Sequence, residues 1–365
     1  MDAATTTHPV GLVAGAVVVL VVLWEAFETI VSPRRVSRRL RLTRVFYRAT
    51  WLPWRAIGRT LPEGRRREGF VSVFGPLSLL VLLVLWAMLL VAGFTLLQWG
   101  AGDGVQAATG RRGWLTDLYV SGATLFTLTP GDLLPTTAAA RALIAIEAGT
   151  GLAILAMVIG YLPLLSQAFS RREVSVSLLD ARAGSPPSAG ELLLRHAGDA
   201  RQDALARLLE QWEQWCAELL ETHVSFPVLA YYRSQHANQS WVAALTAILD
   251  ACALLAAASD GEPSRVALLT FAIARHAAVD LCLVFRLEPR PARADRLPAS
   301  ELDQLRRALR EAGSGLREGP GVDARLQRLR AMYEPYMSAL GTYLMMPLPA
   351  WRGHEGARDN WRGLV

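Results

Sequence analysis

Lysine is absent from this chain of 365 residues, so all 38 of its basic residues are arginine. Charge of either sign is sparse, because 19% of the residues are charged while 52% are hydrophobic, and the mean hydropathy is +0.26. This composition excludes an ordinary soluble protein and predicts a membrane protein. The arginine bias, with abundant Ala, Leu and Gly, is typical of a GC-rich bacterial genome. We therefore expect a protein of the bacterial inner (plasma) membrane.

Cysteine is scarce, and the sequence motifs of most enzyme classes are missing. Cys216, Cys252 and Cys282 have no CxxC spacing, which excludes a zinc ribbon and a disulfide framework and predicts reduced, buried thiols. No P-loop, nucleophile–base pair or paired-carboxylate motif is present, so we expect no enzyme. No Gly-rich turn of a dinucleotide-binding sensor is present either. Groups that bind metals lack HxxxH or CxxC spacing, and no metal site is expected among them: His223, His236, His276, Cys252, Cys282, Asp250 and Asp280.

Long apolar runs are present in three places, each meeting the requirement of about 20 residues for a membrane span. They extend from about Val10 to Val31, from about Val73 to Trp99 and from about Ala138 to Ala168. The first run lacks the preceding basic residues and the small-residue exit of a cleaved leader, so we expect a retained helix. The sequence thus predicts a multi-pass, all-α membrane protein.

The arginines predict how these spans are oriented. Between Pro33 and Phe70 there are twelve Arg against two Glu. Because cytoplasmic loops beside spans are rich in Arg and Lys, this segment is predicted to be cytoplasmic. The N-terminus and the connection 103–137 are then external. The third span returns to Arg171 and Arg172, which places the C-terminus in the cytoplasm.

The stretch 33–61 interleaves arginine with the aromatic residues Phe46, Tyr47, Trp51 and Trp54. This composition is typical of a helix that lies on an anionic leaflet, with aromatic rings at the headgroups and arginine at the phosphates. Nucleic acid is the alternative partner of such a patch, but its place between two spans favours the membrane. We expect anionic lipids to contact the Arg34–Arg67 segment, and no nucleic acid.

Glu25 and Glu28 lie one turn apart near the inner end of the first span. Arg34 and Arg35 follow within two turns, so local ion pairs at the membrane interface are expected. A part in gating is the alternative.

The connection between the second and third runs contains WLTDLYVSGATLFTLTPGDLLPTT, Trp114 to Thr137. It resembles the pore loop of the potassium-channel superfamily, in particular bacterial channels with a single ion-channel domain. The resemblance rests on a pore helix with the aromatic Tyr119, on Thr124, on the pattern Thr-x-x-x-Gly-Asp and on Pro135. The run AARALIAIEAGTGLAILAMVIGYL that follows is similar to the inner helix of such channels.

The resemblance implies a selectivity filter formed by Thr127, Leu128, Thr129, Pro130, Gly131 and Asp132. A potassium filter presents stacked backbone carbonyls, some of them from residues at positive φ that Gly adopts cheaply. Where the family pattern is T-V-G-Y-G-D, Thr129 replaces the first Gly and Pro130 the aromatic residue. A β-branched residue disfavours positive φ, and a residue before Pro is driven to extended backbone. We therefore expect a monovalent cation path for K⁺, and also Na⁺, with weak potassium selectivity and no other cofactor.

Three interpretations of TLTPGD stay open. It is a wider or differently coordinated filter in a channel that conducts, a relic in a non-conducting membrane sensor or scaffold, or an ordinary external turn, since Pro-Gly-Asp favours turns. The channel interpretation implies a homotetramer, because one pore segment encloses no path.

The third run carries the residues expected to line or bend a pore. Gly149, Gly151, Gly160 and Pro163 are candidate hinges, with close helix packing as the alternative for the glycines. Glu147 is an intramembrane carboxylate, expected to form a hydrogen bond behind the filter or to contact the ion.

The second half of the chain reads as helical. The runs Trp241–Ala258 and Val266–Phe285 are apolar, but Asp250, Arg275, His276 and Asp280 argue against spans and predict a helical bundle. The expected organisation is an N-terminal transmembrane helix (1–32), a basic amphipathic linker (33–70), a pore domain of outer helix, pore helix, filter loop and inner helix (71–170), a linker (171–190), an all-α cytoplasmic domain (191–350) and a tail (351–365). No ligand of the bundle can be assigned.

Overall fold

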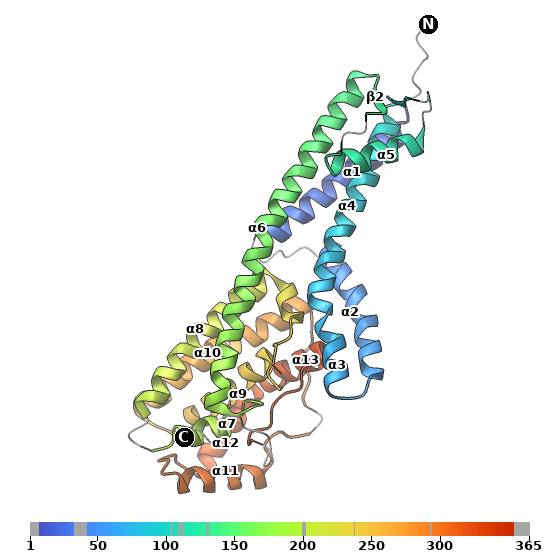
Figure 1. The fold of residues 1–365 in the computed structure, drawn as a ribbon. Helices are drawn as coiled ribbons and strands as arrows, with labels where there is room; N and C mark the ends of the chain where they lie inside the picture. Colours follow the sequence, from blue (N-terminus) through green and yellow to red (C-terminus); the bar gives the residue numbers. More distant parts are fainter. Residues whose placement is uncertain are drawn as a thin grey trace. The chain divides into compact units, whose positions relative to one another are not determined.

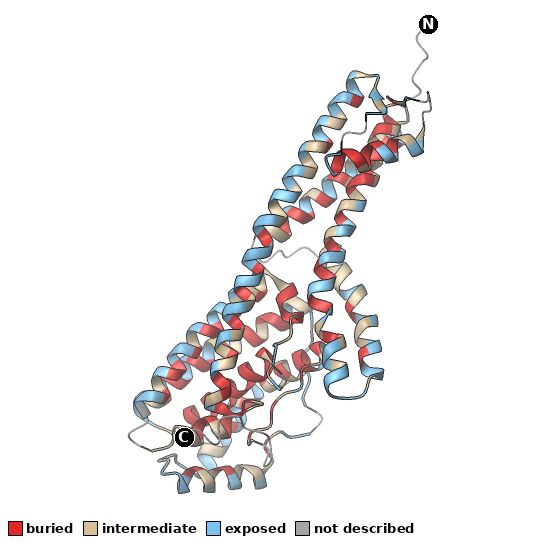
Figure 2. Ribbon diagram, viewed as in Figure 1, coloured by how far each residue is buried: buried red, intermediate tan, exposed pale blue. Residues whose placement is uncertain are grey.

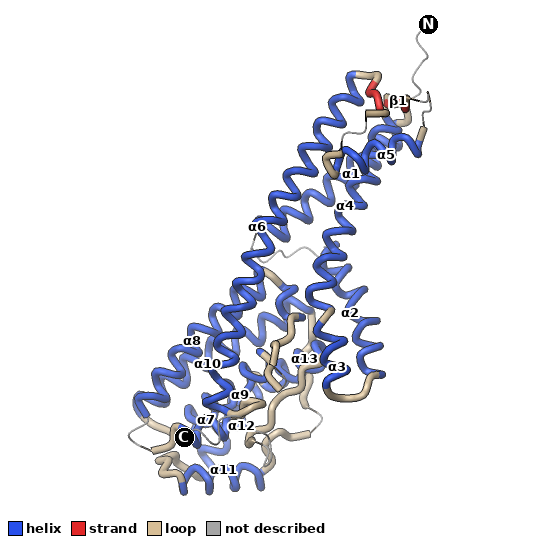
Figure 3. Tube along the Cα trace, viewed as in Figure 1, coloured by secondary structure: helices blue, strands red, loops and turns tan. Residues whose placement is uncertain are grey.

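The computed structural model describes residues 7–32, 42–102, 104–108, 110, 113–128, 131–198, 202–236, 238–292 and 294–353. Most of these residues are helical, and the others form loops and one short two-stranded ladder (Figure 3). The predicted all-α class is confirmed for this part of the chain. Contacts divide the chain into two units, one of residues 1–61 and 76–166 and the other of residues 62–75 and 167–365.

The first unit is built from long apolar helices joined by shorter elements. Its elements are α1 (Pro9–Ala26), the π-helix η1 (Phe27–Val31), α2 (Leu42–Thr60), most of α4 (Phe74–Gly100), β1 (Val105–Ala107), α5 (Trp114–Leu125), β2 (Leu133–Pro135) and the first part of α6 (Ala138–Ala183). α4 and α6 each contribute residues to both units. Figure 1 labels both helices.

α1 and α4 pack closely because glycines face each other between them. Gly11 and Gly15 of α1 are spaced as in GxxxG, and a Cβ at Gly15 would lie 2.6 Å from the carbonyl oxygen of Gly93 on α4. A Cβ at Gly100 would lie 2.5 Å from the backbone nitrogen of Leu12. Small residues at this spacing let two helix backbones approach where no hydrophobic effect drives them together. The GxxxG pattern is the signal in the sequence for this contact, and it was not among the features predicted above.

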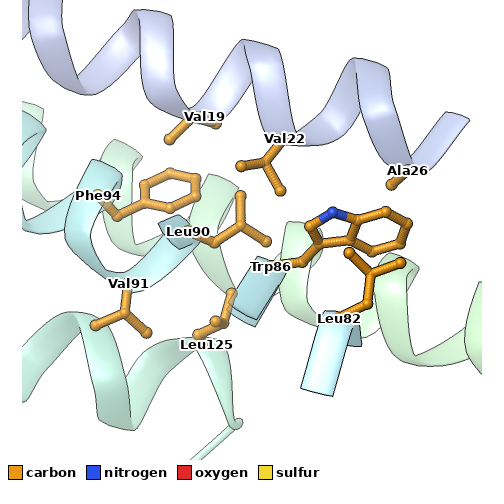
Figure 4. Packing of buried hydrophobic residues seen from close by; sticks show 9 residues of the cluster. All are labelled: Val19, Val22, Ala26, Leu82, Trp86, Leu90, Val91, Phe94 and Leu125. Atoms are coloured by element: carbon orange, nitrogen blue, oxygen red, sulfur yellow. The ribbon is translucent and has the colours of Figure 1, made fainter. Parts of the chain in front are cut away.

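Larger side chains fill the space beside these glycines. Val19 and Val22 of α1 and Trp86 and Phe94 of α4 are buried, and Leu125, the last residue of α5, belongs to the same cluster (Figure 4). α5 is therefore held against α1 and α4 by its C-terminal end.

Glu25 accepts hydrogen bonds from the start of α2. Its carboxylate accepts hydrogen bonds from the backbone N–H groups of Leu42 at 3.0 Å and Thr43 at 3.2 Å, and from the Thr43 hydroxyl at 2.9 Å. These are the first two residues of α2, whose N–H groups have no partner inside the helix, and the helix dipole favours an anion there. Glu28 accepts a hydrogen bond from the Trp24 indole at 2.7 Å. The expected partners Arg34 and Arg35 lie outside the described residues.

The second unit is a helical bundle. Its elements are α3 (Arg65–Ser72), the end of α6, α7 (Ala189–Arg195), α8 (Gln202–Ser225), the 3₁₀-helix η3 (Pro227–Tyr231), α9 (Trp241–Ala258), α10 (Gly261–Phe285), α11 (Ala299–Glu311), α12 (Pro320–Ala331) and α13 (Glu334–Leu344). α10 lies against both α8 and α9, and every residue of α9 is buried (Figure 2).

A charged network is buried beside α9. Asp250 is fully buried and forms an ion pair with Arg296, whose two terminal nitrogens each bond one carboxylate oxygen, at 3.2 and 2.5 Å. The Tyr333 hydroxyl also donates to Asp250, and Arg296 continues to Glu334 at 3.2 Å. Burial, reinforced by the adjacent Asp250 carboxylate, raises the pKa of the Tyr333 phenol. Asp250 is thus a paired interior carboxylate.

The segment 171–190, expected to be a linker, is helical over most of its length. α6 continues to Ala183, and α7 begins at Ala189. Val176 and Leu179 are buried, so this part of α6 packs into the bundle and is not exposed as a linker would be. Arg172, one of the two arginines expected on the cytoplasmic side of the third span, is 4% exposed and donates to the backbone carbonyls of Leu229 and Tyr232 at 2.9 and 2.8 Å.

Five described helical segments are long and apolar enough to cross a membrane, where the sequence predicted three. They are Pro9–Val31, Arg65–Gly100, Ala138–Ala183, Trp241–Ala258 and Gly261–Phe285. The first three contain the predicted spans. The last two are α9 and α10 of the bundle.

Candidate functional site: the segment between α4 and α6

α5 is a short helix between two long apolar ones. Its 12 residues give a length of about 18 Å, less than the roughly 30 Å of a bilayer core. Val120, Ser121 and Thr124 are buried, whereas Tyr119 is 53% exposed. The predicted pore helix is thus present as a helix, with its predicted aromatic residue on the exposed side and Thr124 on the buried side.

A two-stranded ladder joins the two ends of the connection between α4 and α6. β1 and β2 pair antiparallel, with Val105 opposite Pro135. Next to the ladder, the backbone N–H and the hydroxyl of Thr136 both donate to the carbonyl oxygen of Gly104, at 2.8 and 2.9 Å. The chain before α5 and the chain after TLTPGD are therefore held together.

TLTPGD begins as the C-terminal cap of α5. The N–H of Thr127 donates to the Thr124 carbonyl at 2.9 Å, and the N–H of Leu128 donates to the Ala123 carbonyl at 2.8 Å. Thr127 has φ of 57°, in the left-handed region. This is the Schellman arrangement that ends helices, normally with Gly at the left-handed position. Thr127 is therefore a β-branched residue in a conformation that such residues disfavour.

The rest of the loop is described only in part. Thr129 and Pro130, the two departures from the family pattern, lie outside the described residues, so their expected effect stays a prediction. Gly131 is exposed, and no described atom lies within 4 Å of the position that a Cβ would occupy there. The Asp132 carbonyl accepts from the N–H of Ala108 at 2.7 Å, which extends the pairing of the ladder toward the loop.

Glu147 contacts α5. It is fully buried, and one carboxylate oxygen accepts a hydrogen bond from the Ser121 hydroxyl at 3.3 Å. The other carboxylate oxygen has no hydrogen-bond partner among the described residues. The carboxylate thus links α6 to the helix that carries the loop. Whether it supports a filter stays a prediction.

The glycines of α6 fall into two groups. A Cβ at Gly151 would lie 2.2 Å from the carbonyl oxygen of Leu125, so the backbones of α6 and α5 are in contact there. No described atom lies within 4 Å of a Cβ at Gly149 or Gly160, so neither of these serves packing inside the described part of the chain. Pro163 stands inside the continuous helix. Gly151 therefore serves close packing between α5 and α6. The hinge roles of Gly149, Gly160 and Pro163 stay predictions.

An apolar face of α6 is exposed along much of its first part. Leu152, Leu155 and Ile159 are each at least 55% exposed. In the most apolar stretch of 18 residues of this helix, 6% of the residues are buried. The first part of α6 thus presents an exposed apolar surface.

The dispersed metal-binding groups do not assemble. Among the described residues, no group of three or more His, Cys, Asp or Glu is placed to hold a metal ion. His223 lies in the bundle, with its Nε2 3.2 Å from the guanidinium of Arg172, while Asp250 is paired with Arg296.

Comparison with known proteins adds one relative. The chain is 28% identical over 185 residues to "Uncharacterized membrane protein YdjJ" of Bacillus subtilis (strain 168), a match that covers 49% of this chain and 52% of that protein. The chain thus spans about half the length of the curated relative it matches. No family model matches, and no solved structure matches. The similarity and the long apolar helices together identify a membrane protein.

Proposed function

We propose that this chain is a subunit of a potassium-channel-like cation channel, with α1, α4 and the first part of α6 as its membrane spans. The N-terminus is external and the C-terminus cytoplasmic, in a bacterial plasma membrane. Four copies surround one path for K⁺ and Na⁺, to which each contributes α5, TLTPGD and α6. The chain carries passive transport and no catalysis.

The observation that carries the proposal is the succession of a long apolar helix, a short helix buried on one face, a loop and a second long apolar helix. α5 is too short to cross, yet it packs through Leu125 against α1 and α4 and meets α6 at Gly151. Irregular backbone at membrane depth is tolerated only inside protein or beside water. A loop held there by α5 is suited to line an aqueous path at the centre of an oligomer.

We assign α9 and α10 to the cytoplasmic bundle. A helix that is apolar all round is buried either in lipid or in protein, and all 18 residues of α9 are buried within this chain. The ion pair of Asp250 supports the same assignment, since charge inside a bilayer is costly.

The alternative function is that of a non-conducting membrane sensor or scaffold. The cap at Thr127 favours it, because the start of TLTPGD ends a helix in an ordinary way that does not require a carbonyl-lined path. In both functions the bundle is the part exposed to cytoplasmic signals.

Reconstitution in planar bilayers separates the two functions. We expect cation currents with a weak preference for K⁺ over Na⁺, and the variant Thr129→Gly with Pro130→Tyr should raise that preference. Absence of current from any oligomer contradicts the channel, and unchanged ion ratios in a conducting variant contradict TLTPGD as the filter. A mass measurement in detergent tests the tetramer independently, and a monomer contradicts both the pore and the assembly.

A further inference from the structure

α2 has three distinct faces. At 100° per residue, its four arginines, Arg44, Arg48, Arg55 and Arg59, fall within an arc of about 60°. One side of this stripe carries the buried residues Trp51 and Gly58. The other side is apolar and exposed, with Val45 at 55% and Leu52 at 42%.

The charge of α2 is of one sign only. The helix contains no acidic residue, and Arg48 and Arg59 are exposed at its surface. A stripe of arginine beside an exposed apolar stripe fits a surface that is anionic at one depth and apolar just below it. A bilayer with anionic headgroups has this arrangement, whereas a nucleic acid or an acidic protein leaves Val45 and Leu52 in water.

The start of α2 lies near the inner end of the first predicted span. α1 and η1 together make 23 residues, or about 34 Å of helix, which is close to the thickness of the hydrocarbon core. Glu25, in the last turn of α1, caps the first residues of α2. α2 therefore starts beside the last turn of α1, near the inner end of the first predicted span.

From these observations we propose that α2 is an interfacial helix whose stripe of Arg44, Arg48, Arg55 and Arg59 binds anionic phospholipid headgroups while Val45 and Leu52 enter the acyl region. Trp51 and Glu25 fix the rotation of the helix, so that the arginines face the phosphates. The binding is independent of ion conduction, and a non-conducting protein retains it.

The test uses the full chain in nanodiscs with an environment-sensitive fluorophore on Val45→Cys. Labelling is selective because Cys216, Cys252 and Cys282 are all buried. As phosphatidylglycerol replaces phosphatidylcholine, we expect the emission to shift toward that of an apolar environment. Arg48→Gln with Arg59→Gln should weaken the apparent affinity for the anionic lipid about 30-fold, at about 1 kcal/mol per arginine.

Matched control variants show whether the response to anionic lipid comes from the arginines of α2. Arg307→Gln with Arg328→Gln removes two exposed arginines of the bundle and should leave the titration unchanged. Arg48→Lys with Arg59→Lys should retain most of the response, which separates lost charge from lost folding. Equal emission at every lipid composition overturns the proposal, as does a full response in the Gln variant. A shift caused by inorganic phosphate in phosphatidylcholine discs also overturns it, because the site would then bind free anions.

Discussion

The backbone of α6 at Gly151 lies against the carbonyl oxygen of Leu125, the last residue of α5. A Cβ at this position would be 2.2 Å from that oxygen, whereas a Cβ at Gly149, two residues earlier, meets no described atom within 4 Å. Two glycines of one helix thus have different roles. This contact sets how closely the helix that carries TLTPGD approaches the helix that follows it.

Gly151→Ala should therefore destabilise the first unit, and Gly149→Ala should not. We expect a loss of about 1–3 kcal/mol for Gly151→Ala, since a backbone atom cannot move aside cheaply. Gly149→Ala should be neutral or stabilising by up to about 1 kcal/mol, because Ala favours helix over Gly. Thermal unfolding in detergent measures both, and equal effects would contradict the contact.

The close approach of α1 and α4 predicts that Gly15 tolerates no side chain. Gly15→Val places atoms against Gly93 and Leu97, so α1 should separate from α4 and unfolding should occur at a lower temperature. Val13→Leu is the control, because Val13 is 65% exposed on the same helix. Cysteine cross-linking between α1 and α4 reports the separation, and unchanged cross-linking in Gly15→Val would exclude this packing.

His223 should make the bundle less stable in acid. Burial, and next to it the charge of Arg172, hold the pKa of the imidazole well below its usual range. Below about pH 6.5 the unfolded chain takes up a proton that the folded chain does not, so stability falls as pH falls, by up to about 1.4 kcal/mol per pH unit. Above that pH both states are neutral and the effect is absent.

Chemical unfolding between about pH 5 and pH 8, the range in which histidine titrates, measures this dependence. The acid-dependent loss should shrink in His223→Gln, while His236→Gln, which removes an exposed imidazole, should retain it. An identical pH profile for wild type and His223→Gln would assign the acid sensitivity to other groups.

Asp250 should be essential to the bundle. Asp250→Ala leaves Arg296 buried without its main partner and should cost about 3–5 kcal/mol. Asp260→Ala is the matched control, since Asp260 is 73% exposed in its pair with Arg317 and should change stability by less than about 0.5 kcal/mol. Similar unfolding curves for the two variants would show that the buried pair contributes little.

Local pattern and composition predicted much of the helical framework. The three apolar runs could be located because a membrane span needs a length of apolar sequence that few other segments have. A helix in the connection Trp114–Thr137 and helices over Trp241–Ala258 and Val266–Phe285 were also predicted, and α5, α9 and α10 confirm them. Asp250 in the run Trp241–Ala258 indicated a bundle helix, because a carboxylate in an apolar run requires a partner.

The partners themselves came only from the tertiary structure. Glu25 caps α2, because the unpaired N–H groups of a helix end attract a carboxylate from another helix. Its expected pairing with Arg34 and Arg35, which lie outside the described residues, stays a prediction. Arg172 was expected only to follow the third span on its cytoplasmic side, and its backbone-carbonyl partners lie in the segment that contains η3. Neighbours distant in sequence decide such contacts, and no local pattern specifies them.

The segment TLTPGD combines both kinds of information. The sequence by itself determined its place between two long apolar runs and its two departures from the potassium-filter pattern, because residue identity limits φ and hydrogen bonding locally. Only the tertiary structure decided that Thr127 takes the left-handed position of a helix cap and that Leu125 lies against Gly151. The reason is physical: backbone-to-backbone contact between α5 and α6 depends on the packing of whole helices, which the composition of six residues does not encode.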